Sequence, residues 1–382
     1  MAKQTIEDLS AEFKAIRQEV LAAVTRVLDS GRFTLAREVE ALEEAICQQC
    51  GVRFAIGVSS GSTALELALA AADVGPGDEV VTVANTDSAV ANAICRAGAG
   101  IAWADIDIAT FNVDHRDLGA RIGPRTKAIV VTHMHGRPAD MNPLIALAAR
   151  HNLVTIEDAA LAWGAEYDHR RVGTMATIGC FSFAPTKVLG GIGDSGALVT
   201  NDPSIASRIR VLRKYGHCDA PEAISSNLDW TFVDAGVNGR MDEIQAAVLS
   251  IRLSHVDEYI GQRRRNAAMY TQLLRGLPIV LPEEDPRAFA VYRAYTICTD
   301  RRDMLRQHLS EVGVETRTYY SPSLHMQPAY VHRSRLADSL PATDRADREA
   351  VSLPVHPSLR EADIRFIAGS VERFFSAAAA QD

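Results

Sequence analysis

The sequence predicts a large α/β domain with a mostly parallel sheet, followed by a smaller α+β domain. Short apolar runs alternate with helical patterns from about residue 50 to residue 215. A long helical pattern then runs from Asp242 to about Leu274, and beyond a loop near residues 277–285 the regular alternation ends. Alternating strands and helices imply crossover connections, which join parallel strands and cover both faces of the sheet.

Seven apolar runs supply the predicted strands of the large domain. In chain order they are FAIGVSS, EVVTV, IAWADI, AIVVTH, LVTIED, CFSF and GALVT. Helical patterns between them run through TALELALAAA, DSAVANAICRAG and NPLIALAARH. Apolar positions at helical spacing support the long helix that follows: Ile244, Val248, Ile251, Leu253 and Val256. We therefore predict a seven-stranded sheet with helices on both faces.

The smaller domain begins with a strand in AVYRAYTICTD. A helix in MLRQHLSEVG, a proline-containing loop and two further helices follow. We assign residues 1–250 to an N-terminal arm and the large domain, and residues 251–382 to the small domain. The long helix blurs this boundary, which we place between residues 240 and 285.

Composition excludes some classes of partner. The chain has 48 acidic and 40 basic residues, a net charge of -8, which argues against a surface that follows nucleic-acid phosphates. No stretch approaches the roughly 18 apolar residues that a membrane helix needs. The first thirty residues lack the basic start and apolar core of a secretion signal. We expect a soluble, cytoplasmic protein.

The cysteine and histidine patterns do not predict a metal site. The six cysteines stand at positions 47, 50, 95, 180, 218 and 298. Cys47 and Cys50 form a C-x-x-C within the helical run VEALEEAICQQC, and no second pair follows, so we interpret them as two thiols on a helix. His133 and His135 lack a nearby set of carboxylates and histidines, so we expect no metal.

Four short segments carry candidate chemistry, and the first is GVSSGSTALELAL. A strand ends there and a helix begins around Gly61, Ser62 and Thr63. A small-residue turn lets a ligand approach the backbone, and the free N–H groups of a helix start favour an anion such as phosphate. A simple helix cap explains the same residues.

The other three segments place charged or polar residues at strand and helix ends. Asp158 closes the apolar strand of IEDAALAWGA, where a carboxylate needs a cationic partner unless it caps a helix. Lys187 lies between an apolar strand and a run of glycines in FSFAPTKVLGGIGDSGA, which makes it either a candidate amine nucleophile or a surface lysine. Asn238 and Arg240 precede a helix in GVNGRMDEIQAAVL, as an ordinary loop also would.

Together with PGDEVV, GRPADM, SLHMQPAY and LPVHPSL, these segments resemble the DegT/StrS family of nucleotide-sugar aminotransferases from about Arg32 to Phe375. The resemblance implies the fold type I of pyridoxal-phosphate-dependent transferases, which is the fold of aspartate aminotransferase. It implies that Lys187 holds the cofactor as a Schiff base and that Asp158 keeps the pyridine nitrogen protonated. It assigns the phosphate to the backbone of Gly61 and to a set of side chains: Ser62, Thr63, Ser182 and, from the neighbouring subunit of a homodimer with shared active sites, Asn238.

The activity that the resemblance implies is a ping-pong transamination. An amino acid, glutamate or glutamine, would donate nitrogen to a nucleotide-linked keto-sugar or to a cyclitol ketone in sugar or antibiotic biosynthesis. Two alternatives remain open. One is another pyridoxal-phosphate reaction, such as dehydration, decarboxylation or epimerisation, although relatives that remove a sugar hydroxyl replace the lysine with histidine. The other is a regulator that binds the cofactor without turnover.

Three residues depart from the family pattern near the expected ring. Asp87 occupies the position of a stacking aromatic residue, Leu161 that of a glutamine and Trp163 that of a histidine. We hypothesise that Trp163 restores apolar contact and that Asp87 meets an amine or hydroxyl group of an unusual substrate. The alternative is that Asp87 points away or that the alignment slips locally. We also expect an acceptor site lined by Tyr319, His325 and Arg240.

Overall fold

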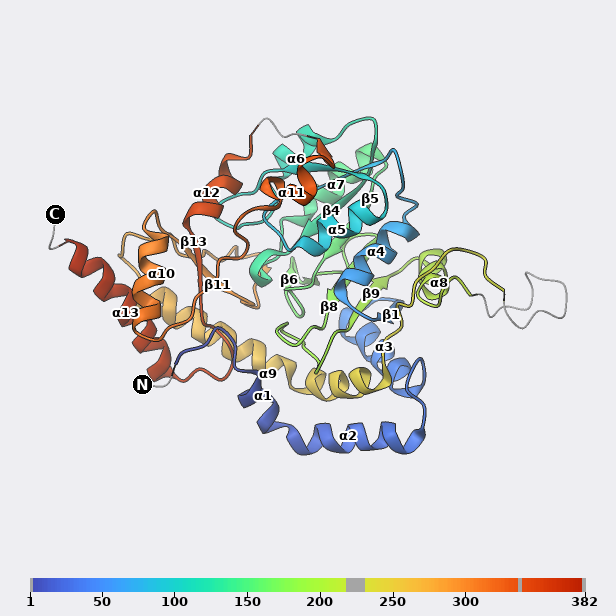
Figure 1. Cartoon of the computed structure of the whole chain (residues 1–382), viewed down its shortest axis with the longest axis horizontal. Coiled ribbons are helices and arrows are strands. Elements are labelled where there is room, and N and C mark those ends of the chain that lie inside the picture. Colours follow the sequence, from blue (N-terminus) through green and yellow to red (C-terminus); the bar gives the residue numbers. More distant parts are fainter. Residues whose placement is uncertain (1–2, 218–230, 336–338, 380–382) are drawn as a thin grey trace.

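A computed structural model describes residues 3–217, 231–335 and 339–379 of the chain (Figure 1). Its main sheet has eight strands in the order β1-β9-β8-β5-β4-β2-β3-β12. The seven predicted strands are all present: β1 (Phe54–Val58), β2 (Glu79–Val83), β3 (Gly100–Ala104), β4 (Thr126–Thr132), β5 (Val154–Asp158), β8 (Ile178–Ser182) and β9 (Gly196–Thr200). This confirms the predicted fold class.

The sheet is parallel except at β9, which pairs antiparallel with both β1 and β8. The eighth strand, β12 (Ser334–Arg335), comes from the C-terminal part of the chain and pairs in parallel with β3 at the edge of the sheet. The prediction of seven strands was therefore one short. Two residues are too few to show a strand period, so only the pairing itself reveals β12.

Helices cover both faces of the sheet, as predicted. They include α3 (Arg37–Cys50), α4 (Gly61–Ala71), α5 (Ser88–Arg96), α6 (His115–Arg121), α7 (Met141–His151) and α8 (Pro203–Leu212). Neighbouring residues of β2 point to opposite faces, because side chains alternate along a strand. Val80 packs in the apolar cluster with α4, α5 and α8, whereas Val81 packs in the cluster with α3 and α7.

The long helix α9 (Glu243–Leu273) joins the two parts of the molecule (Figure 1). It packs against α2 (Arg17–Ser30) and α3 near its start and against α13 (Glu361–Ala379) near its end. Helix α1 (Leu9–Ala15), which precedes α2 in the chain, contacts α9 through a buried ion pair of 2.8 Å between Glu12 Oε2 and Arg252 Nη2. Because α9 belongs to both parts, the boundary near residue 250 stays a prediction.

The small domain has its own core around Tyr270, Leu305 and Ile367. It contains the antiparallel pair β11 (Tyr295–Cys298) and β13 (Ala350–Leu353), with α10 (Arg302–Glu311) and α13 beside them. The chain between these strands returns to the large domain, where Leu324 and Tyr330 join its core. The remaining short elements are β6 (Glu166–Tyr167), β7 (Arg170–Arg171), β10 (Ala288–Phe289), η1 (Met134–Gly136), η3 (Leu324–Met326), α11 (Pro328–Val331) and α12 (Pro341–Glu349).

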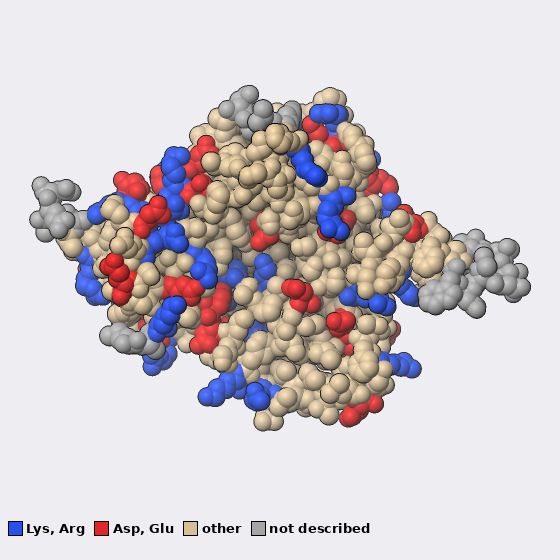
Figure 2. All heavy atoms as spheres, in the orientation of Figure 1, with Lys and Arg blue, Asp and Glu red and all other residues tan. Residues whose placement is uncertain are grey.

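The distribution of surface charges and the helical position of Cys47 and Cys50 are consistent with the sequence. Figure 2 shows acidic and basic side chains interspersed over one face of the molecule, with neither sign forming a continuous area. Cys47 and Cys50 lie on α3, as predicted, and burial raises the pKa of Cys50 to about 12, which keeps that thiol protonated. Cys218 lies outside the described residues. Among the helices that the structure describes, none is long and apolar enough to cross a membrane.

Candidate active site

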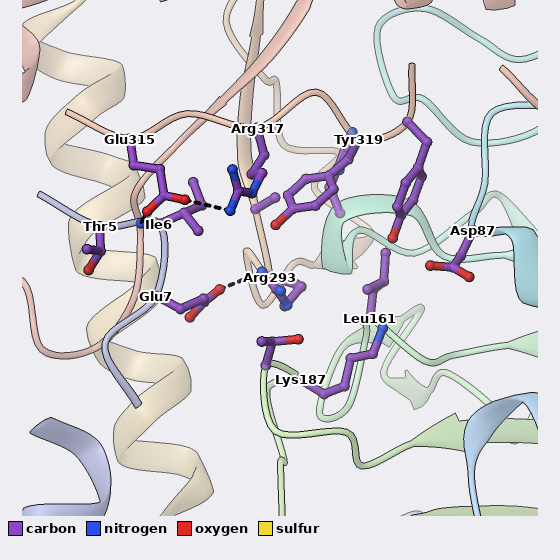
Figure 3. A pocket seen from close by; sticks show the side chains of 14 residues that line it. Thr5, Ile6, Glu7, Asp87, Leu161, Lys187, Arg293, Glu315, Arg317 and Tyr319 are labelled. Carbon is purple, nitrogen blue, oxygen red and sulfur yellow. Dashed lines mark hydrogen bonds and ion pairs between the residues drawn. The ribbon is translucent and has the colours of Figure 1, made fainter. Parts of the chain in front are cut away.

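A cavity of about 460 Å³ lies between the carboxyl ends of the parallel strands, the N-terminal arm and the small domain (Figure 3). Ligand sites of open α/β sheets occupy this edge, because the loops that follow the strands converge there. Its lining comes from segments far apart in the chain: Thr5, Ile6, Glu7, Asp87, His135, Leu161, Thr186, Lys187, Arg293, Ala294, Glu315, Arg317, Tyr319 and Tyr320.

Lys187 lies in the turn that follows β8. Its backbone N–H donates to Ala184 at 2.9 Å, and the Gly191 N–H donates to Phe183 at 2.8 Å, so the turn folds back on the strand end. The lysine side chain is partly buried and has no ion-pair partner in the described chain. Burial, with help from Arg293, lowers the pKa of the Lys187 amine, although Asp87 and Asp158 oppose this. A lowered pKa favours the neutral, nucleophilic amine.

Asp158 is the last residue of β5, and only 4% of it is exposed. Its Oδ1 accepts the Ala160 N–H at 3.1 Å, and its Oδ2 accepts from Thr132 Oγ1 at 3.5 Å. Burial raises the pKa of this carboxyl, against the opposing effects of the Ala160 N–H and Lys187. No cationic side chain in the described residues pairs with it, so a cation from a ligand would stabilise the carboxylate. A protonated pyridine nitrogen meets that requirement.

A second buried pair lies beside Asp158. His133 Nδ1 accepts the Ala139 N–H at 3.0 Å, so the ring proton sits on Nε2, which donates to Glu157 Oε2 at 2.9 Å. The Glu157 carboxylate also accepts N–H groups from Gly173 at 2.6 Å and Met175 at 2.7 Å. These bonds satisfy both side chains and hold the end of β5 in place. His133 therefore has a structural partner rather than a place in a metal site.

The start of α4 and the end of β8 form a small, polar cradle. Ser60 caps α4 by accepting the Thr63 N–H at 3.0 Å, and Thr63 Oγ1 lies 3.0 Å from the Ser59 and Ser60 hydroxyls. A Cβ atom on Gly61 would lie 2.6 Å from Ser182 Cβ, so glycine is required for this approach. Ser62 at the same helix start is exposed. Free N–H groups, hydroxyls and close backbone suit a phosphate.

These features together fit pyridoxal phosphate. The Lys187 amine suits the cofactor aldehyde, the Asp158 carboxylate suits the ring nitrogen, and the cradle of α4 suits the phosphate. The sequence pattern predicted all three places from residues at strand and helix ends.

The three departures from the family pattern occupy different places. Asp87 lines the cavity and caps α5, because its Oδ1 accepts the Ala89 N–H at 2.9 Å. Leu161 also lines the cavity. Trp163 instead packs edge-on against Phe181, at a centroid distance of 4.9 Å, within the core that supports the site. The structure thus brings two of the three to the cavity.

Of the three residues expected to line the acceptor site, one lies at the cavity and two lie outside its described lining. Tyr319 lines the cavity, and Figure 3 shows it above Arg293. His325 lies in η3 and pairs with Asp344 at 3.2 Å. Arg240 Nε donates to Asn238 Oδ1 at 3.1 Å, and Asn238 is exposed. His325, Arg240 and Asn238 lie outside the lining that the described residues of this one chain form.

Sequence reasoning missed four charged residues of the cavity. Arg293 Nη1 pairs with Glu7 Oε1 at 2.6 Å, and Arg317 Nη2 pairs with Glu315 Oε1 at 2.6 Å (Figure 3). Glu7 belongs to the N-terminal arm, which the small domain holds through the Gln4–Val314 bridge. No motif marks these residues: the Glu7–Arg293 pair joins residues far apart in the chain, and the Glu315–Arg317 pair is local but reaches the cavity only through the fold.

The chain is similar to known proteins over nearly its whole length. The profile of the DegT/DnrJ/EryC1/StrS aminotransferase family matches residues 14–372. The chain is 42% identical over 353 residues to the dTDP-3-amino-3,4,6-trideoxy-alpha-D-glucose transaminase of Streptomyces venezuelae, which covers 92% of this chain and 91% of the relative. It is 40% identical over 371 residues to the pleiotropic regulatory protein of Geobacillus stearothermophilus, covering 96% and 97%. The crystal structure of S. venezuelae DesV in complex with a ketimine intermediate matches with a TM-score of 0.93 and 39% identity, covering 98% and 99%.

Proposed function

Because the chain belongs to the DegT/DnrJ/EryC1/StrS aminotransferase family, we propose that it transfers an amino group from glutamate or glutamine to a keto-sugar. The family depends on pyridoxal phosphate, and the chain is one of its aminotransferases. The observation that carries the proposal is the proximity of two titratable groups, Lys187, which lines the cavity, and Asp158, which ends β5. A partly buried amine, Lys187, and a buried carboxylate without an ion-pair partner in the described chain, Asp158, each influence the pKa of the other.

Each group has a defined task. The Lys187 Nζ would join the cofactor aldehyde covalently, and Asp158 would hold the ring nitrogen in its protonated form. When bound, the cofactor withdraws electrons from the carbon that carries the transferred amine. After an incoming amine displaces Lys187, the freed Nζ would carry a proton between the substrate carbon and the cofactor carbon to which it was bound. Ser182 and the start of α4 would hold the phosphate.

The acceptor we propose is a nucleotide-linked keto-sugar, with a cyclitol ketone as the second candidate, within sugar or antibiotic biosynthesis. Support comes from relatives of similar length, among them the S. venezuelae transaminase, whose name specifies a dTDP-linked amino sugar. The charged side chains of the cavity, on the arm and the small domain, lie where an acceptor would enter.

We further propose a homodimer in which Asn238 reaches the phosphate of the neighbouring subunit. Asn238 is exposed and bridges to Lys214, next to Tyr215. Large apolar side chains are exposed in this region and on the N-terminal helices: Leu21, Leu28, Phe33, Ile192, Tyr215, Phe232 and Val233. Burial of such side chains stabilises an interface. The five described cysteines are free, which suits a reducing compartment, so we place the enzyme in the cytoplasm.

A half-reaction experiment tests the proposal. We expect glutamate or glutamine to abolish the absorbance of the bound aldehyde, and a keto-sugar to restore it. Borohydride treatment before the donor is added should leave a reduced adduct on the peptide that contains Lys187, identified by mass spectrometry. The Lys187→Ala variant is the control, because it lacks the amine. If no amino acid changes the absorbance of the native protein, the aminotransferase assignment is wrong.

A further inference from the structure

The charges that line the cavity do not balance once Lys187 is bound to the cofactor. Arg293 pairs with Glu7 and Arg317 pairs with Glu315 at 2.6 Å each, so both guanidinium groups already have a carboxylate partner, although Glu7 also pairs with Arg263 at 3.2 Å. Asp87 is the remaining carboxylate of the lining, and no described side chain forms an ion pair with it. When the Lys187 amine joins an aldehyde, the lining retains two guanidinium groups and three carboxylates.

The Asp87 side chain is oriented so that its carboxylate can contact a ligand in the cavity. Its Oδ1 accepts the Ala89 N–H at 2.9 Å, which fixes the side chain at the start of α5. Figure 3 shows the Asp87 carboxylate facing the cavity, on the same side as Lys187 and Leu161. The side chain is half-buried, so water screens its charge less than at an open surface. Cap geometry thus holds a partly desolvated anion beside the reacting amine.

The neighbouring groups of the lining cannot neutralise Asp87. His135 is 2% exposed, and burial, reinforced by Arg137 and Arg293, lowers its pKa to about 3, so the ring is neutral. Tyr320 is a neutral phenol, since burial and the nearby Asp87 raise the pKa of its hydroxyl. Leu161 is apolar. A partly buried carboxylate without a cation is costly, and a cationic ligand would remove that cost.

We propose that Asp87 selects an acceptor that already carries an ammonium group, such as an amino-substituted keto-sugar or aminocyclitol ketone. This inference rests on the proposed function and narrows its substrate class. A hydroxyl-bearing acceptor would donate only a neutral hydrogen bond to Asp87, whereas an ammonium group adds a full charge. Charge-assisted hydrogen bonds are about twice as strong as neutral ones.

The test uses two matched dTDP-linked keto-sugars that differ in one group, an amine or a hydroxyl, one ring carbon away from the ketone. The enzyme is first converted to its amino form with glutamate, and the return of the aldehyde absorbance is followed. For the amine-bearing acceptor, Asp87→Asn should lower kcat/KM about 10- to 100-fold, and for the hydroxyl-bearing acceptor less than about 3-fold. Binding of the two corresponding sugar alcohols, measured by calorimetry, should show the same preference and its loss.

Asn also caps helices, so Asp87→Asn removes the charge and keeps the cap. Asp114→Asn is the matched control, because Asp114 caps α6 by accepting the Arg116 N–H at 2.8 Å and lies outside the cavity lining. It should leave both acceptors unaffected. Equal losses for both acceptors in Asp87→Asn, or a native enzyme that does not prefer the amine, would overturn the inference. If neither glutamate nor glutamine converts the native enzyme at all, the proposed function itself has failed.

Discussion

The two residues that we propose for the chemistry of the site, Asp158 and Lys187, have surroundings that act on them in complementary ways. Asp158 is a buried carboxyl whose neighbours supply one N–H at 3.1 Å and a hydroxyl at 3.5 Å, so the fold disfavours its charged form. Lys187 is an amine that burial drives toward its neutral form. A cofactor with an aldehyde and a protonated ring nitrogen relieves both costs. Binding of the cofactor would therefore remove an electrostatic cost that these two side chains carry in the protein without cofactor.

Substitution of Asp158 should expose this cost. Because burial raises the pKa of Asp158 in the folded state, its contribution to stability is fully present below the unfolded pKa of about 3.9 and is lost as the pH rises through the folded pKa. Asp158→Asn has no such dependence. We expect the apo form of the variant to melt at a higher temperature at pH 7, by about 1 °C for each kcal/mol relieved, with a smaller difference near pH 4.

The same variant should lose activity, by about 100- to 1,000-fold in kcat, because an amide cannot keep the ring nitrogen protonated. Thermal denaturation of the apo-protein across pH and the glutamate half-reaction measure the two effects. A variant with the melting profile of the native apo-protein at every pH would contradict the interpretation.

Among the elements, the contact between α4 and β8 shapes the site that we propose for the phosphate. The first turn of α4 meets the last residue of β8 closely enough that only glycine fits at position 61. The Ser60 cap fixes where α4 begins, which in turn sets where its free N–H groups point. We therefore propose that a helix cap, a glycine and a strand end together form the anion site. None of these features would suffice alone.

Gly61→Ala tests this element. The added Cβ would lie 2.6 Å from Ser182 Cβ and 3.1 Å from its Cα, so the helix or the strand must shift. We expect overpacking to cost about 1–3 kcal/mol of stability, and the affinity for pyridoxal phosphate to fall at least about 10-fold.

Titration of the apo-protein with the cofactor, followed by absorbance, measures the affinity. The control is Gly75→Ala, because a Cβ there meets no atom within 4 Å. Equal cofactor affinity in the two variants would show that the close approach of α4 to β8 is unimportant.

Over the whole molecule, the cavity depends on parts that come from both ends of the chain. The arm reaches the small domain through the Gln4–Val314 bridge, and Glu7 pairs with Arg293 and, at 3.2 Å, with Arg263 of α9. On the proposed homodimer, a second chain would add Asn238. Such a site would be complete only when the domains, the arm and the partner are assembled.

Mixing of inactive variants tests the shared site. Lys187→Ala lacks the amine, and Asn238→Glu would place an anion against the phosphate of the neighbouring subunit. A mixed dimer would contain one intact site, so refolded equal mixtures should recover about a quarter of native activity. A mixture of Lys187→Ala with Asp158→Asn is the control, because both changes affect the same site, and the dimer regains no complete site. Absence of recovery in the first mixture would show that Asn238 does not act across subunits.

The sequence by itself determined the seven long strands of the main sheet, most of the helices and the places of Lys187, Asp158 and Gly61 at the ends of these elements. These features follow from local rules: side-chain periodicity, caps, and polar residues at the ends of apolar strands. Only the tertiary structure decided that Trp163 packs in the core, that β12 joins the sheet, and that Glu7 of the arm pairs with Arg293 at the cavity. Those outcomes depend on contacts between residues far apart in the chain, whose partners no local pattern specifies.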